Sequence, residues 1–296
     1  RSWASPWETE EREMTKSMGE RIRSLFRWNE AAASGAWPKR LYVLDFSRGI
    51  AAFAVVVWHW QHFYFLKQGL PRSFRWSQEP WFDLLKLPYQ RGLLAVDYFF
   101  LLSGFIFFWL CSDAISARRV DAPTFAFQRF SRLYPLHLLT LLLVLGLQSL
   151  HADWFGHPFV YGNLDPRHLL LNLGFVQSWG FEVGASFNGP AWSISVEFFL
   201  YVVFFLLAFW KLAMPGTCVV LSVVAFAGSF HCDAPLLRGI ASFFLGGVVH
   251  AVLGHLLRTP RARWRWIHAA TIACWVAVLV DFHVHGFSRS IAAGWR

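Results

Sequence analysis

A basic side chain and an imidazole stand eleven residues apart in the first long apolar stretch of the sequence, residues 41–66. On a helix this spacing is three turns plus about 20°, so Arg48 and His59 face the same side, roughly 16 Å apart. A guanidinium suits a phosphate, and an imidazole can take a proton from a hydroxyl near neutral pH. A long donor with phosphates at one end and a thioester at the other would span this distance, with Asp45 holding Arg48 extended. The alternative is that Arg48 reaches the membrane surface and His59 is satisfied inside the core.

A second polar group begins at an Asn-Gly-Pro turn signal and continues into an apolar stretch. Ser193 and Glu197 lie four residues apart on one helical face, beside Trp192. We expect Glu197 to lie on the same outer side as His59 and to orient or charge that imidazole. Asn188 or Ser193 could donate hydrogen bonds to the oxyanion of an acyl-transfer reaction. The alternative for Glu197 is a carboxylate that is satisfied by helix N–H groups.

Four further polar residues lie near the ends of apolar stretches. Asp97 opens the second stretch, where the helix dipole also favours a carboxylate, and Ser103 is small enough to let helices approach closely. Arg129 and Arg132 precede the third stretch, where they could meet lipid headgroups or donor phosphates. The following Pro135 suits the first turn of a helix.

Metal binding is not expected. His59 and His62 have helical spacing, but two histidines without a neighbouring carboxylate or cysteine make a weak metal signal. The four cysteines are scattered through or beside apolar runs and are interpreted as small core residues.

The elements that carry these residues are predicted to be membrane-spanning helices. Of the 296 residues, 56% are hydrophobic and 15% are charged, against about 25% charged in a soluble domain. The predicted fold is an all-α polytopic transmembrane bundle around one polar cavity. A piece at 168–179 is too short to cross and should be re-entrant or interfacial. Seven spans are predicted, at residues 41–66, 93–111, 133–150, 192–210, 218–230, 237–257 and 267–282.

Basic residues predict the orientation of the bundle. Residues 1–40 carry eight Lys/Arg and form a predicted cytoplasmic polar tail, followed by a transmembrane domain at 41–296. The basic loops at 113–132 and 258–265 should be cytoplasmic too, which explains the net charge of +9 without a nucleic-acid partner. The bilayer is then the first partner, and the oligomeric state stays open.

Four segments in order resemble the integral membrane acyltransferase family 3. Residues 44–59 are similar to its L-D-x-x-R-G-x-A-A opening with R-x10-H, and residues 96–105 to V-D-x-F-F-x-L-S-G-F. Residues 129–135 resemble R-x-x-R-I-Y-P, and residues 192–197 resemble W-S-L-S-x-E. The resemblance covers roughly residues 41–257.

This resemblance implies an O-acyltransferase of the bacterial inner (plasma) membrane with acetyl-CoA or another acyl-CoA as co-substrate. The acceptor would be a hydroxyl of a carbohydrate or a lipid-linked sugar. Arg48 and His59 would be the essential pair and Glu197 a further functional position, with transfer either direct or through an acyl-histidine. Family members have about ten spans, so a bundle shortened at the C-terminus is expected.

The competing hypothesis is a proton-coupled transporter or flippase, which also uses intramembrane charges. Such a protein would be expected to show an inverted repeat, and the sequence has no detectable one. In either case, specificity should lie in the outer loops 66–92 and 151–191. Their aromatic residues could stack on sugar rings or anchor the chain at the interface: Trp76, Trp81, Tyr89, Trp154 and Tyr161.

Overall fold

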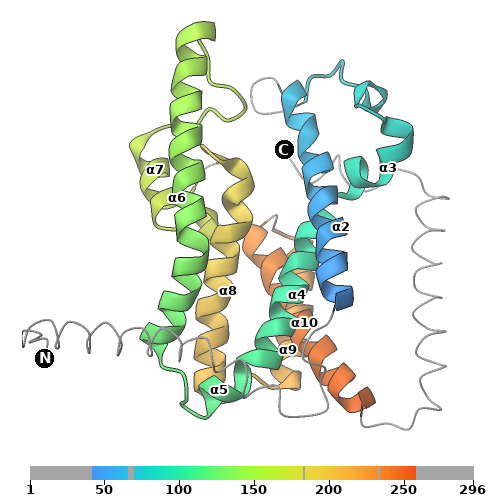
Figure 1. The fold of residues 1–296 in the computed structure, drawn as a ribbon, viewed down its shortest axis with the longest axis vertical. Coiled ribbons are helices and arrows are strands. Elements are labelled where there is room, and N and C mark those ends of the chain that lie inside the picture. Colours follow the sequence, from blue (N-terminus) through green and yellow to red (C-terminus); the bar gives the residue numbers. More distant parts are fainter. Residues whose placement is uncertain (1–41, 66–69, 183, 233, 258–296) are drawn as a thin grey trace, which may run out of the picture.

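The computed structural model describes residues 42–65, 70–182, 184–232 and 234–257. These residues form an all-α bundle (Figure 1). The predicted tail at 1–40 and the predicted span at 267–282 lie outside them. The helices in chain order are α2 (Tyr42–His59), α3 (Phe82–Arg91), α4 (Leu94–Leu110), α5 (Ser112–Ser116), α6 (Ala122–Phe155), α7 (Pro166–Leu173), α8 (Trp192–Phe209), α9 (Pro215–Gly228) and α10 (Pro235–Leu257). Short helical turns complete them: η1 (Trp60–Tyr64), η2 (Trp76–Gln78), η3 (Gln177–Phe181) and η4 (Gly189–Ala191).

Within the described part of the chain, four helical segments are long and apolar enough to cross a bilayer: Tyr42–Tyr64, Ala122–Phe155, Gly189–Phe209 and Pro235–Leu257. The pair α3 and α4 meets the same test together, but it bends by 55° at their junction. The predicted span at 218–230 forms α9, whose 14 residues fall short of the roughly 20 that a bilayer core needs. The piece at 168–179 contains most of the eight-residue α7 and the start of the short η3, as expected for a segment that does not cross.

The core lies where α4, α8 and α10 meet. It is built largely of phenylalanine, and the rings of Phe107, Phe204 and Phe243 pack mutually with centroids 5.2–6.0 Å apart. Such aromatic pairs each contribute about 0.5–1.5 kcal/mol beyond the area they bury. Two glycines bring α4 and α10 into backbone contact. A Cβ on Gly104 would lie 1.9 Å from the Phe243 carbonyl oxygen, and one on Gly246 would lie 2.1 Å from that of Leu101.

Helix α6 begins earlier than the sequence predicted. The carboxylate of Asp121 accepts a hydrogen bond of 3.0 Å from the Thr124 N–H, and this cap starts a 34-residue helix. Pro135 therefore lies inside the helix, so its predicted first-turn position is wrong. The reason is that capping chemistry at Asp121 makes the polar stretch before residue 133 helical too.

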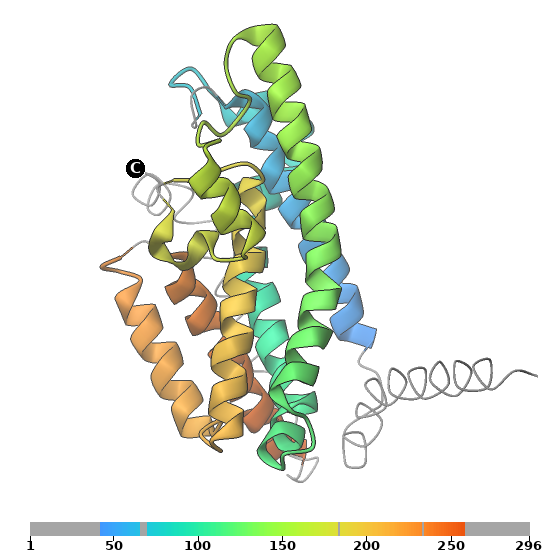
Figure 2. The same cartoon turned by 90° about the vertical axis from the view of Figure 1, so that its left-hand side faces the viewer.

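Several loops and short helices lie together at one end of the bundle. Figure 2 shows α6 running the full height of the bundle, with α7 and its flanking loops packed beside its upper half. In Figure 1, α3 lies beside the upper end of α2, which is the end that carries His59. The segments that precede α3 and surround α7 thus lie at the same end of the molecule as this histidine.

Candidate active site

The imidazole of His59 is oriented by its own helix. It is the last residue of α2, half-buried, and its Nδ1 lies 2.7 Å from the Val55 carbonyl oxygen. A carbonyl can only accept, so Nδ1 must carry the proton, and Nε2 of the neutral ring keeps its lone pair. Nε2 is therefore the nitrogen that can take a proton from a hydroxyl or attack a carbonyl carbon.

A second histidine extends the polar group at this end. The Nδ1 of His62 lies 3.0 Å from the His59 carbonyl oxygen, and the two rings are 5.2 Å apart. The Tyr161 hydroxyl lies 3.3 Å from His62 Nε2. Burial raises the pKa of Tyr161 to about 12, so this hydroxyl stays protonated and donates to His62. The H-x-x-H spacing was visible in the sequence, whereas the Tyr161 contact joins residues far apart in the chain.

Arg48 lies on the same helix as His59, which keeps both on one face as predicted. Its guanidinium is 4.0 Å from the Asp45 carboxylate, and the two side chains are 43% and 70% exposed. An exposed pair at this separation is worth less than about 1 kcal/mol, so Arg48 can exchange Asp45 for a stronger anion. Beside it, the Tyr98 hydroxyl donates a 2.6 Å hydrogen bond to Ser47 and fixes α2 against α4.

Glu197 does not pair with His59, which contradicts the prediction. Its carboxylate accepts hydrogen bonds from the Tyr201 hydroxyl and, at 3.2 Å, from Ser103. Helix α4 runs toward the end of the bundle where α2 begins (Figure 1), and Ser103 follows Tyr98, which meets α2 at Ser47, by about one and a half turns of α4. His59 lies twelve residues, about 18 Å, above the level of Ser47, so the two groups are roughly 20 Å apart along the bundle. The Val55 carbonyl takes the orienting role predicted for Glu197.

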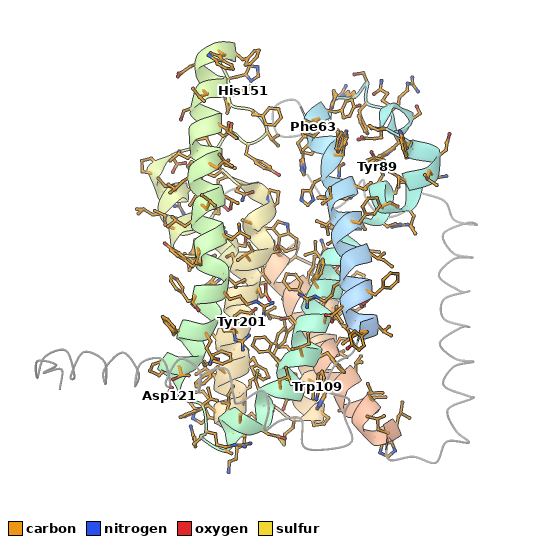
Figure 3. All side chains as sticks on the ribbon, in the orientation of Figure 1. Phe63, Tyr89, Trp109, Asp121, His151 and Tyr201 are labelled. Atoms are coloured by element: carbon orange, nitrogen blue, oxygen red, sulfur yellow. The ribbon has the colours of Figure 1, made fainter. Side chains whose placement is uncertain are left out.

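Arg129 lies over the aromatic rings that flank Glu197. Its guanidinium carbon is 4.7 Å from the Phe107 ring centre and 5.9 Å from that of Tyr201, whose hydroxyl donates to Glu197 (Figure 3 labels Tyr201). Its buried Nε has no acceptor among the described residues. Arg132 lies exposed one turn further along α6. The two arginines therefore offer N–H donors to an anion at the lower half of the bundle.

Asp97 is paired with a residue that sequence reasoning did not single out. Arg238 of α10 donates to the Asp97 carboxylate at 2.7 Å, and its guanidinium carbon lies 6.0 Å from the Trp192 ring centre. This ion pair joins α4 to α10 beside the aromatic start of α8. Asp97, Arg238 and Trp192 thus support the bundle and lie apart from His59.

The two predicted oxyanion donors both have acceptors already. Asn188 Nδ2 donates to Thr140 Oγ1 at 3.3 Å, and Ser193 Oγ donates to the Pro190 carbonyl at 3.4 Å. Both bonds are long enough to be exchanged for a better acceptor. Among the described residues, no three histidine, cysteine, aspartate or glutamate side chains are grouped as metal ligands.

Spanning helices that carry arginine, glutamate and histidine define a polytopic membrane protein with polar groups inside the bundle. The sequence matches the acyltransferase 3 family, described as an acyltransferase domain, over residues 41–295. The chain therefore belongs to this family.

Two known proteins are similar to parts of this chain. "Acyltransferase MdmB" of Streptomyces mycarofaciens is 40% identical over 116 residues, which are 38% of this chain and 27% of that protein. "Protein 2 in picA locus" of Rhizobium radiobacter is 28% identical over 208 residues, 64% of this chain and 92% of that protein. The chain thus spans about a quarter of the first relative's length. No solved structure matches significantly.

Proposed function

We propose that the protein transfers an acyl group, acetyl in the simplest case, from a coenzyme A thioester to a hydroxyl of a carbohydrate or lipid-linked sugar. The observation that carries this proposal is the position of Arg48 and His59 on one face of a spanning helix in a member of an acyltransferase family. A phosphate-binding group and a proton acceptor roughly 16 Å apart suit a long donor whose phosphates and thioester lie at opposite ends.

The residues of the lower half fit the donor's phosphates. Arg48 is held only weakly by Asp45, and Arg129 has a buried N–H without an acceptor among the described residues. Arginine forms charge-assisted, often bidentate hydrogen bonds with phosphate. We infer that Arg48, Arg129 and Arg132 bind these phosphates from the cytoplasmic side, with the N-terminus in the cytoplasm of a bacterium. Glu197 positions the Ser103 and Tyr201 hydroxyls between α4 and α8.

His59 would carry out the proton transfer at the outer end. In direct transfer, Nε2 takes the hydroxyl proton as the oxygen attacks the thioester carbonyl, and coenzyme A leaves as a thiolate that His59 reprotonates. In the two-step alternative, Nε2 itself attacks the carbonyl and coenzyme A leaves as a thiolate. The hydroxyl oxygen then displaces His59 from the acyl-histidine, and the hydroxyl proton passes to the thiolate or to water. Asn188 or Ser193 would donate hydrogen bonds to the oxyanion in either route.

The proposal is tested with radiolabelled acetyl-CoA. The full chain in proteoliposomes should bind acetyl-CoA and move its label to members of a panel of glycosides and lipid-linked sugars. Empty liposomes prepared in parallel serve as the control. A preparation that neither binds nor consumes acetyl-CoA, nor any longer acyl-CoA, would contradict the proposal.

Arg48→Ala should raise the KM for acetyl-CoA about 10–100-fold, because a hydrogen bond to a charged group contributes about 1.5–3 kcal/mol. The effect on kcat should be smaller, since the phosphates lie far from the reacting carbonyl. Arg119→Ala, at an exposed arginine of the basic loop at 113–132, is the matched control. Equal KM values for Arg48→Ala and wild type would exclude the phosphate role.

A further inference from the structure

An open cavity of about 440 Å³ lies in the segment that joins α2 to α3. This volume is within the usual range for small-molecule sites. The Tyr64 hydroxyl donates a 3.0 Å hydrogen bond to the Gln78 carbonyl, which ties the cavity-forming segment to the chain just after His59. Figure 3 shows Phe63 and Tyr89 at this same end of the molecule. The cavity is lined by Ser77, Glu79, Trp81, Phe82, Asp83 and Leu84.

Glu79 supplies an unused hydrogen-bond acceptor at this cavity. The residue is 3% exposed, and neither carboxylate oxygen has a donor among the described residues. Burial raises the pKa of this carboxyl group, because the charged form loses its hydration. A buried polar group without a partner costs free energy that an entering O–H or N–H donor would recover.

Trp81 supplies an apolar ring beside this carboxylate. It is 76% exposed, although an indole of this size is usually largely buried. Its backbone is left-handed at φ 56°, a conformation that costs free energy in a non-glycine residue. Behind it, the Trp76 and Phe82 rings stack with centroids 6.4 Å apart, and the buried Tyr89 hydroxyl donates to the Pro80 carbonyl. The packed side chains of Trp76, Phe82 and Tyr89 thus support the segment that exposes the Trp81 indole at the cavity.

The cavity lining offers carboxylate acceptors to a ligand that carries hydrogen-bond donors. Glu79 and Asp83 are the two acidic residues of the cavity lining. Neutral hydroxyl groups can donate to both carboxylates.

We propose that this cavity binds a sugar ring of the acyl acceptor, with the ring stacked on Trp81 and its hydroxyls donating to Glu79 and Asp83. Aromatic faces and carboxylates together match the two kinds of surface that a sugar presents, apolar C–H faces and hydroxyl edges. The proposal rests on the proposed function for its acceptor class, and it assigns that acceptor to one site near His59.

The test is a binding titration with a panel of methyl glycosides and disaccharides, using the full chain in lipid nanodiscs. At least one glycoside should bind, and Glu79→Gln and Trp81→Leu should each weaken its Kd about tenfold or more. Asp113→Asn and Trp210→Leu change exposed residues outside both outer loops and should leave the Kd unchanged.

Folding of the Glu79 variant can be checked independently. A carboxyl group whose pKa is raised on folding favours the folded state at low pH and opposes it as pH rises through this range. Glu79→Gln removes the charge, so the variant should melt no lower than wild type at pH 7. A variant that folds yet binds glycosides as tightly as wild type would overturn the proposal, as would choline bound in place of sugars.

Consumption of acetyl-CoA without acceptor, measured on the same preparations, separates the two proposals. If acetyl-CoA is consumed but the glycoside Kd is the same in all variants, only the cavity assignment fails. If glycosides bind through Glu79 and Trp81 while acetyl-CoA is neither bound nor consumed, the cavity assignment stands and the donor assignment fails. If Trp81→Leu lowers recovery from membranes without changing the Kd, Trp81 is an interfacial anchor and the cavity assignment is overturned.

Discussion

Replacing His59 with alanine should lower acyl transfer by at least about 100-fold, because general-base catalysis contributes about 10²–10⁴ in rate. The loss would be complete if Nε2 forms an acyl-histidine, since no other group would then carry the acyl intermediate. Initial rates of label transfer from acetyl-CoA measure the effect. Binding of acetyl-CoA should persist, because Arg48 lies about 16 Å away along α2, and Arg129 and Arg132 lie on another helix, α6.

His231→Ala is the matched control, since His231 is exposed in the turn between α9 and α10. Rapid quenching without acceptor, followed by mass spectrometry of the peptide that contains residue 59, distinguishes the two chemical routes. An acetyl group on that peptide indicates the two-step route. Turnover of His59→Ala within a few-fold of wild type would remove His59 from the mechanism.

Gly246→Ala should destabilise the bundle by about 1–3 kcal/mol or more, the usual cost of overpacking a tight core. The new Cβ would lie 2.1 Å from the Leu101 carbonyl oxygen, and backbone cannot rotate away as a flexible side chain can. Helices α4 and α10 would have to separate, and both the phenylalanine core and the Asp97–Arg238 ion pair depend on their contact. Thermal unfolding in detergent, followed by size-exclusion chromatography, measures the loss.

Gly146→Ala is the control variant, because α6 has space for an added methyl group at this position. A Cβ at Gly146 meets nothing within 4 Å, and alanine is the better helix former by about 1 kcal/mol. This variant should melt at or slightly above the wild-type temperature. If Gly246→Ala and Gly146→Ala melt alike, the close contact between α4 and α10 does not limit stability.

The sequence was sufficient to predict a helical fold. It was not sufficient to predict how far along the bundle each helix lies relative to its neighbours. Apolar run lengths predicted the all-α fold, and one helix was enough to place Arg48 and His59 on one face. The pairing of Glu197 with His59 failed because it assumed that two residues near outer helix ends lie at one level. Relative height is set instead by contacts such as Tyr98 with Ser47 and Ser103 with Glu197, which join distant parts of the chain.

Arg238 could have been singled out as a candidate functional or structural residue from the sequence. It is a charged residue at the start of a predicted span, which is a functional or structural signal in itself. Its partner could not be read from the sequence, because Asp97 lies 141 residues earlier. Glu79 was missed for a different reason, since only coordinates reveal that this loop carboxylate is buried with no donor from the part of the chain that the structure describes.

The ion pair between Asp97 and Arg238 also affects how the helices assemble during synthesis. Synthesis proceeds from the N-terminus at about 5–20 residues per second, so α4 emerges several seconds before α10. During that interval Asp97 has no counter-ion from α10, and an unpaired charge within a membrane helix is costly. We therefore expect α4 to stay near the translocation machinery or the lipid interface until Arg238 arrives. Closure of the bundle would then be a late, single event of biogenesis that locks charge pairing and glycine packing together.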